Sequence, residues 1–112
     1  MKAGNVIMRD VHINGLQYFV IIAEQKMKKR FMTLLDEYDA RGIEVVYAHG
    51  SMSPSAVAAA FGFESVQNKV MISCLLKDEK AKELMRVLYD KYNFNKPNTG
   101  IAFSVSVEGM AF

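Results

Sequence analysis

Apolar residues recur at helical spacing in two segments of the chain. Each segment places apolar side chains three or four residues apart and charged residues between them, which predicts two amphipathic helices. We expect Gly42 to end the first helix and Asp78 to be the N-cap of the second, which extends to about residue 92. The apolar faces are Met27, Phe31, Leu34, Leu35 and Tyr38 in the first helix, and Ala81, Leu84, Met85, Leu88 and Tyr92 in the second.

Four other segments are rich in Val, Ile, Phe and Tyr and are predicted to be strands. With the helices they give the order βαββαβ, which is typical of an α+β ferredoxin-like domain: a four-stranded antiparallel sheet with two helices on one face. The predicted strands are Leu16–Ala23, Ile43–His49, Lys69–Leu76 and Gly100–Val107.

The third and fourth predicted strands are apolar at nearly every position, although a sheet with one solvated face should alternate polar and apolar residues. The second face of the sheet therefore needs cover as well. We expect other subunits to supply it.

The connection from Gly50 to Asn68 is much longer than the two to five residues that usually join adjacent antiparallel strands. It contains its own helix signals, with Ser53 as N-cap, Pro54 at the first helical position and Gly62 as terminator. The pattern predicts a short helix in a segment that contacts a partner.

Composition fits one domain over residues 1–112, because 112 residues at 51% hydrophobic composition suffice for a single core. Residues 1–14 are expected to be disordered or to extend an edge strand. The net charge of +2 does not indicate nucleic-acid binding. Cys74 is the only cysteine, which suits the cytoplasm, and no apolar run approaches the roughly 20 residues that a membrane-spanning helix requires.

The sequence lacks the complete motifs of RNA-binding, metal-binding and common catalytic sites. Residues 60–63 (Ala-Phe-Gly-Phe) resemble the aromatic core of an RNA-recognition strand, but the flanking residues do not match and the segment precedes a strand. His12 and His49 have no ligand partners at metal-binding spacing, so no metal site is predicted. The signatures of nucleophile elbows, zinc proteases and P-loops are absent from the sequence, so no catalytic residue is assigned.

Two polar segments have alternative interpretations. The cations of residues 26–30 could meet an anion, but we interpret them as a solvated helix face. The turn of residues 95–100 (Asn-Lys-Pro-Asn-Thr-Gly) offers a charge, amides, a hydroxyl and open backbone, so it could hold a phosphate or carboxylate or could simply lead into the last strand.

Residues 96–103 (Lys-Pro-Asn-Thr-Gly-Ile-Ala-Phe) resemble the B-loop and following strand of the PII-like nitrogen regulatory family. Residues 42–50 (Gly-Ile-Glu-Val-Val-Tyr-Ala-His-Gly) are similar to the family's second strand and the base of its T-loop. The resemblance covers about Leu16 to Val107. It implies a homotrimer that packs sheets around an axis and binds ligands in clefts between subunits.

By position, the resemblance assigns candidate ligand-binding residues to both loops. They are Gly50 and Ser51 at the T-loop base and Lys96, Thr99 and Gly100 in the B-loop.

Three departures from the family pattern bear on the ligand. Ile101 stands where the family has a phosphate-contacting lysine, the C-terminal arginines are missing, and Met52, Ser53 and Pro54 replace a glycine and an Arg-Gln pair. They argue against the ATP and 2-oxoglutarate sensing of the best-known members. An adenine nucleotide remains a candidate ligand, as does a different small anion.

The leading hypothesis is a regulatory, non-enzymatic trimer that binds a small metabolite or nucleotide and acts through a partner protein that contacts the segment Gly50–Asn68. The alternative is a small enzyme on an oligomeric ferredoxin-like scaffold, for which Tyr47, His49 and Cys74 are the candidate groups. A divalent-cation tolerance protein on the same trimeric scaffold is a third possibility.

Overall fold

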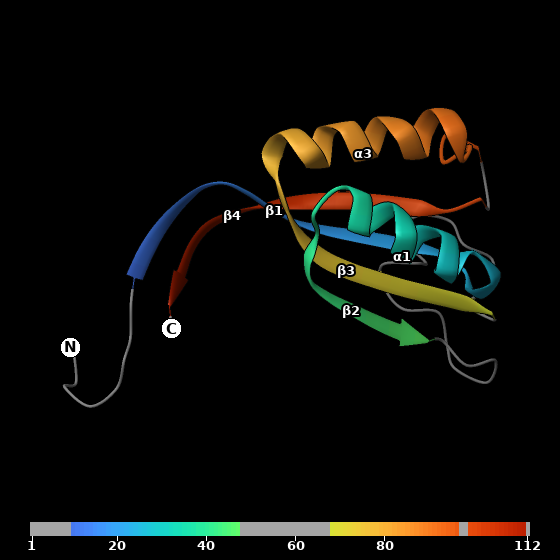
Figure 1. The fold of residues 1–112 in the computed structure, drawn as a ribbon, viewed down its shortest axis with the longest axis horizontal. Coiled ribbons are helices and arrows are strands. Elements are labelled where there is room, and N and C mark those ends of the chain that lie inside the picture. Colours follow the sequence, from blue (N-terminus) through green and yellow to red (C-terminus); the bar gives the residue numbers. More distant parts are fainter. Residues whose placement is uncertain (1–9, 48–67, 97–98, 112) are drawn as a thin grey trace.

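The computed structural model describes residues 10–47, 68–96 and 99–111. Within them the order of elements is βαββαβ, and the four strands form one antiparallel sheet in the order β2-β3-β1-β4 (Figure 1). The predicted ferredoxin-like fold is therefore confirmed. The elements are β1 (Asp10–Glu24), η1 (Gln25–Met27), α1 (Lys28–Glu37), β2 (Arg41–Tyr47), β3 (Lys69–Lys77), α3 (Asp78–Lys91) and β4 (Ile101–Ala111).

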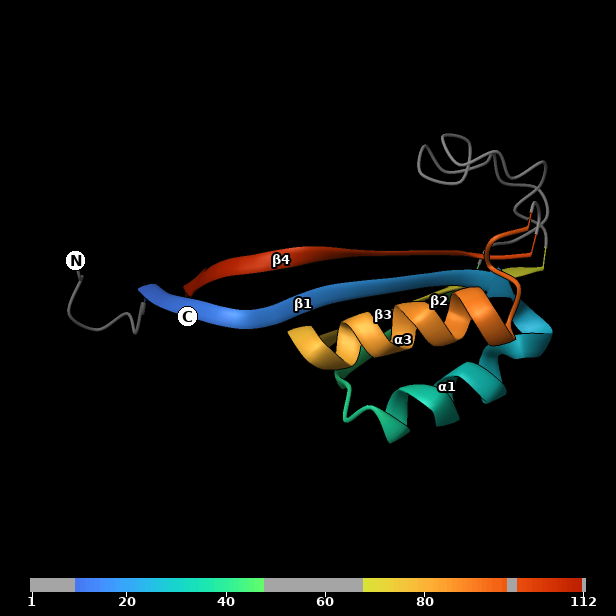
Figure 2. The ribbon, with the colours of Figure 1, turned by 90° about the horizontal axis from the view of Figure 1, so that it is seen from above.

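Both helices cover the same face of the sheet, as the view from above shows (Figure 2). The core between helices and sheet is built from alternate residues of the two central strands, because successive side chains of a strand point to opposite faces. The buried side chains that form it are Phe19, Ile21 and Ala23 of β1, Val70, Ile72, Cys74 and Leu76 of β3, Phe31, Leu34 and Leu35 of α1, and Ala81, Leu84 and Leu88 of α3.

Helix α1 buries the predicted apolar face but ends at Glu37, not at Gly42. Asp39 adopts the left-handed conformation, with φ 60°, and takes the place expected of the glycine. The amide of Ala40 donates to the carbonyl of Leu35 at 3.1 Å, and that of Asp39 donates to Asp36 at 3.1 Å. These two bonds satisfy carbonyls at the helix end, as in a Schellman motif, so the chain turns into β2 earlier than the sequence predicted.

Helix α3 also differs from its prediction at the start. Asp78 is its first helical residue, and Lys77 occupies the N-cap position without a capping side-chain bond. The carboxylate of Asp78 instead accepts a 2.7 Å hydrogen bond from Gln17 Nε2, which also donates to Ser106 Oγ at 3.2 Å. Asp78 therefore ties the start of α3 to β1 and β4, and its charge is favourable near the helix N-terminus.

The face of the sheet opposite the helices is also apolar. Val20, Ile22 and Ile101 form a small buried cluster on it, with Met71 and Phe103 packed alongside. Three further residues of this face are exposed: Tyr18 at 40%, Val46 at 54% and Val105 at 54%. Tyr18 and Val105 are directly paired across β1 and β4, so their side chains form one continuous apolar patch.

Strands β1 and β4 are longer than predicted and run on together past the end of β3 (Figure 1). Asp10 pairs with Ala111 and His12 with Gly109, and the register shifts between His12 and Leu16. Gly15, with φ 82°, lies inside this irregularity, where a left-handed residue is needed. The result is a two-stranded extension of the sheet.

A substitution of Phe31 tests how the core is packed. The residue is 1% exposed, and its ring makes edge-to-face contacts with Tyr92 and Phe94. We expect Phe31→Ala to lower the free energy of unfolding by about 3–5 kcal/mol through loss of buried area and a cavity. The neighbouring exposed change Arg30→Ala should stay within about 0.5 kcal/mol. Urea unfolding at one fixed protein concentration measures both, and equal effects would show that Phe31 does not anchor the core.

Candidate functional site

All four strands have a terminus at one end of the sheet. Strand β2 ends there at Tyr47, which pairs with Val70, and β4 begins there at Ile101, which pairs with Ile22 of β1. The segment 48–67 leaves β2 from this end, and the turn from α3 to β4 enters it. We call it the loop end of the sheet. Two segments are predicted to bind ligand, one directly after β2 and one directly before β4. Both therefore join the sheet at the loop end.

The turn between α3 and β4 is anchored by its own backbone. Asn93 adopts φ 61° after the end of α3, and this left-handed residue reverses the chain. The amide of Phe94 then donates to the Leu88 carbonyl at 3.1 Å, and the amide of Lys96 donates to the Asn93 carbonyl at 2.9 Å. The start of the turn is therefore fixed to the last turns of α3.

Phe94 fixes the other side of this turn through packing. Its ring lies 5.8 Å from that of Phe31, edge to face, and belongs to the helix-side core. A Cβ atom added to Gly100 would overlap Phe94 Cζ and come within 2.6 Å of Cε1. Only glycine fits at position 100 while Phe94 stays in the core, so Gly100 is required by contact with the ring.

Of the predicted site residues, Lys96, Thr99 and Gly100 lie within the described part and are brought to the loop end. Lys96 is exposed, and Thr99 and Gly100 are half-buried. Gly50 and Ser51, like Met52 and the helix predicted in residues 53–62, lie outside the described residues.

Ile101 shows what replaces the family's lysine. Its side chain is 8% exposed and belongs to the apolar cluster with Val20 and Ile22, on the sheet face away from the helices. The position after Gly100 therefore serves packing in this chain and supplies no charge.

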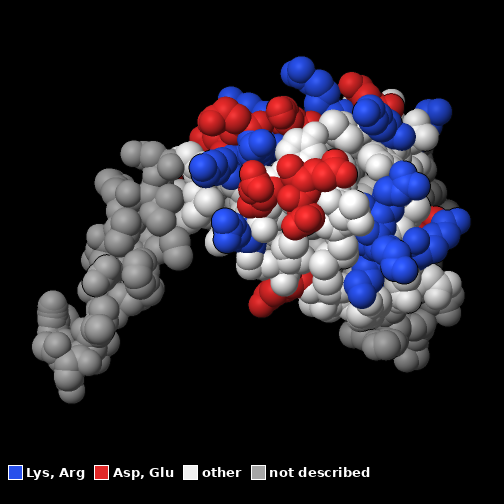
Figure 3. All heavy atoms as spheres, viewed as in Figure 1, with Lys and Arg blue, Asp and Glu red and all other residues white. Residues whose placement is uncertain are grey.

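Positive charge gathers beside the loop end, at the start of the first helix. The four cations of residues 26–30 lie where η1 and α1 begin, and blue side chains gather on that side of the molecule (Figure 3). Lys26 contacts Glu24 at 3.6 Å with both side chains largely in solvent, and Lys28 Nζ lies 5.5 Å from the ring centre of Tyr47. Exposed pairs of this kind add little stability, so these cations remain available to an anion.

The candidate catalytic groups find little support among the described residues. Cys74 is buried in the core, and burial raises the pKa of its thiol to about 11, so it is protonated at neutral pH and is a poor nucleophile. Tyr47 is 41% exposed at the end of β2, and His49 lies outside the described residues. No group of three or more potential metal ligands occurs in the part that the structure describes.

Sequence reasoning missed Phe94, whose ring contacts Phe31 in the core and leaves no room for a side chain at Gly100. The available signal was Asn93 followed by an aromatic residue directly after a predicted helix, since asparagine tolerates the left-handed conformation. That signal does not tell which glycine the aromatic ring will contact.

A family model described as Nitrogen regulatory protein P-II matches residues 16–111. The chain belongs to the P-II family. The resemblance that the B-loop and T-loop motifs suggested is thereby confirmed, and the family is a regulatory one.

Solved P-II-like structures share the fold of this P-II protein. The apo form of CPII from Thiomonas intermedia K12, a nitrogen regulatory PII-like protein, superimposes with a TM-score of 0.65 at 17% identity, covering 94% of this chain and 98% of that one. A PII-like signalling protein from Thermus thermophilus gives 0.59 at 17% identity, with 96% and 92% coverage. CPII bound to ADP, AMP and acetate gives 0.59 at 19% identity, with 96% and 92% coverage.

At these identities the structural likeness establishes the fold alone. No curated protein matches the sequence. Among the helices of the described residues, none has the length and apolar character needed to cross a membrane.

The contact between Gly100 and Phe94 makes a testable prediction. We expect Gly100→Ala to lower the free energy of unfolding by about 1–3 kcal/mol, because the new methyl group pushes the Phe94 ring out of the core. In a Phe94→Ala background the same change should cost much less, since the clash is gone. Denaturant unfolding of the four proteins in this cycle gives the coupling energy, and additive effects would contradict the assigned contact.

Proposed function

We propose that this P-II protein is a regulatory homotrimer that binds an adenine nucleotide in clefts between subunits at the loop end. In this proposal the ligand changes the segment Gly50–Asn68, which contacts a partner protein. The observation that carries the proposal is the position of the B-loop turn: Lys96, Thr99 and Gly100 lie at the same edge of the sheet as the end of β2, beside a group of exposed cations.

The apolar sheet face supports assembly. Tyr18 and Val105 form an exposed pair at the side of the sheet away from the helices, and Val46 is exposed on the same face. Large contiguous apolar surface is costly in water and marks interfaces in soluble proteins. A closed ring of three identical chains would bury this face around one axis.

The ligand class is supported by the loop chemistry and by the neighbours. CPII from Thiomonas intermedia has been solved with ADP and AMP, together with bicarbonate or acetate. In this chain Lys96 supplies a positive charge for a phosphate, and Thr99 supplies a hydroxyl group. Gly100 has no side chain, so a ligand can approach its backbone. We assign Gly50 and Ser51 to the same site from the opposite loop.

Ile101 sets the expected selectivity. An apolar residue in the position of a phosphate-contacting lysine weakens the hold on a third phosphate, so we expect ADP or AMP to bind better than ATP. We expect 2-oxoglutarate to have no effect of its own.

The enzyme alternative lacks a specific observation in its favour. Its buried candidate, Cys74, has a raised thiol pKa, and the described residues contain no cluster of three or more His, Cys, Asp or Glu side chains that could assist Tyr47. A binding role without catalysis, in the reducing cytoplasm that a free thiol suits, is the better account.

The ligand assignment is tested by thermal shift with ATP, ADP, AMP, cyclic AMP, bicarbonate and 2-oxoglutarate. A ligand of the native state raises the melting temperature with concentration, and we expect at least about 5 °C with saturating ADP or AMP. Lys96→Ala and Thr99→Ala should each weaken that shift, whereas Lys91→Ala, an exposed change at the end of α3, should leave it intact. Indifference to every nucleotide would contradict the proposal.

The assembly is tested separately by light scattering. We expect a mass near three times the 12.6 kDa of one chain, and Val105→Lys should dissociate the assembly because it places charges together on the shared face. Ser104→Lys is the matched control, since this adjacent residue is exposed but its side chain points to the opposite side of the strand. Equal behaviour of the two variants would remove this face as the interface.

A further inference from the structure

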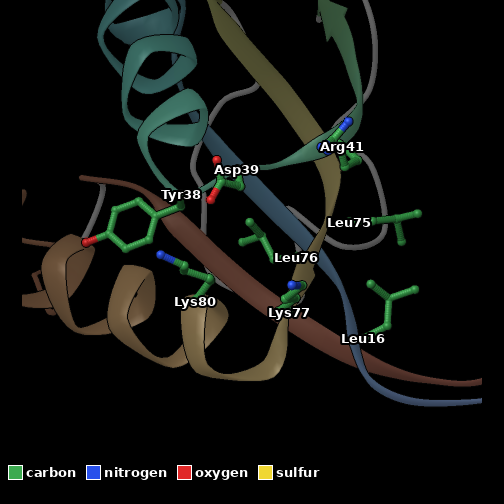
Figure 4. Close-up of a pocket in the computed structure, with 8 residues that line it drawn as sticks. All are labelled: Leu16, Tyr38, Asp39, Arg41, Leu75, Leu76, Lys77 and Lys80. Atoms are coloured by element: carbon green, nitrogen blue, oxygen red, sulfur yellow. The ribbon is translucent and has the colours of Figure 1, made fainter.

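A cavity of about 490 Å³ lies at the end of the sheet opposite the loop end. It opens between the turn from α1 to β2 and the turn from β3 to α3 (Figure 4). Protein pockets that hold small molecules have volumes of roughly 300–1,000 Å³. The cavity therefore has the size of a ligand site and is separate from the predicted B-loop residues.

Three leucines give the cavity an apolar part. Leu76 of β3 is 1% exposed, and Leu16 of β1 and Leu75 of β3 are half-buried. Figure 4 shows Leu16 and Leu75 on one side of the strands with Arg41 beside Leu75, and Tyr38, Asp39 and Lys80 nearer the two helices. A ligand in the cavity would therefore meet both hydrocarbon and polar groups.

Positive charge prevails in the polar part. Arg41, Lys77 and Lys80 line the cavity, and Asp39 is the only carboxylate among its lining residues. None of the three cations forms an ion pair with a carboxylate in residues 10–47, 68–96 and 99–111. The lining therefore carries more positive than negative charge, which favours an anion.

Tyr38, Asp39 and Lys80 form the helix side of the cavity. Lys80 Nζ lies 6.0 Å from the ring centre of Tyr38, and the side chains of Tyr38, Asp39 and Lys80 lie toward one another in Figure 4. Burial, with Glu83 and Glu37 nearby, raises the pKa of Tyr38, so its hydroxyl keeps its proton at neutral pH and can donate a hydrogen bond. In Figure 4 the Tyr38 hydroxyl points away from the other lining residues, so Lys80 adjoins the ring of Tyr38 and not its hydroxyl.

We propose that this cavity is a second ligand site, which binds a small organic anion that carries an apolar body. The carboxylate or phosphate of the ligand meets Arg41, Lys77 and Lys80, and its apolar body packs on Leu16, Leu75 and Leu76. The lining offers both kinds of contact that such a molecule needs. This site does not depend on the proposed nucleotide site, since the two use different ends of the sheet.

The test is a titration of the full-length protein, in its native assembly, with leucine methyl groups labelled for NMR. Phenyl phosphate is the probe, and inorganic phosphate and benzyl alcohol each supply half of its chemistry. We expect phenyl phosphate to give saturable shifts at Leu16, Leu75 and Leu76 but not at Leu34, which lies elsewhere in the core. Both partial probes should bind at least about tenfold more weakly.

Charge variants decide whether the cations recognise the anion. Lys80→Gln and Arg41→Gln should each raise the dissociation constant of phenyl phosphate at least about fivefold. The chemical shifts caused by benzyl alcohol should stay unchanged. Lys82→Gln is the matched control, because Lys82 is an exposed lysine of the same helix that does not line the cavity. The proposal is overturned if phenyl phosphate gives no saturable shift at these leucines, or if the cavity variants bind it as tightly as Lys82→Gln does.

Discussion

Strand β1 has side chains buried on both of its faces, and the rest of the structure follows from this constraint. Five consecutive residues, Phe19 to Ala23, are each no more than 6% exposed. Alternate members of this run belong to two different apolar clusters, one beneath the helices and one on the opposite face. A strand of this kind must sit in the middle of its sheet, and β1 does so between β3 and β4.

The fold was largely predictable because it depends on periodic patterns. The spacing of Phe31, Leu34 and Leu35 defined the buried face of α1, and the run of apolar residues in β3 predicted a strand that is apolar on both faces. The errors lie where local chemistry competes with pattern. Asp39 ended α1 in a conformation usually left to glycine, and Asp78 used its carboxylate to bind Gln17 across the sheet. The sequence pattern alone predicts neither the conformation of Asp39 nor the hydrogen bond of Asp78, whose partner is a neighbour only in the folded structure.

The candidate site was predictable in its composition but not in its construction. Lys96, Thr99 and Gly100 could be found from the motif, because turn residues with charge and hydroxyl groups are recognisable in sequence. The contact between Phe94 and Gly100 is tertiary: it depends on α1 placing Phe31 where the ring of Phe94 can pack. The cavity beside Lys80 is likewise assembled by two turns that are distant in the sequence.

The two-stranded extension has a consequence for how the chain is connected. Asp10 and Ala111 are paired neighbours, so the two ends of the described fold lie side by side. An antiparallel pair of this kind can be closed by a hairpin loop of about two to five residues. A circularly permuted form of the described fold, joined from Ala111 to Asp10 and opened elsewhere, would therefore keep every strand pairing of the sheet.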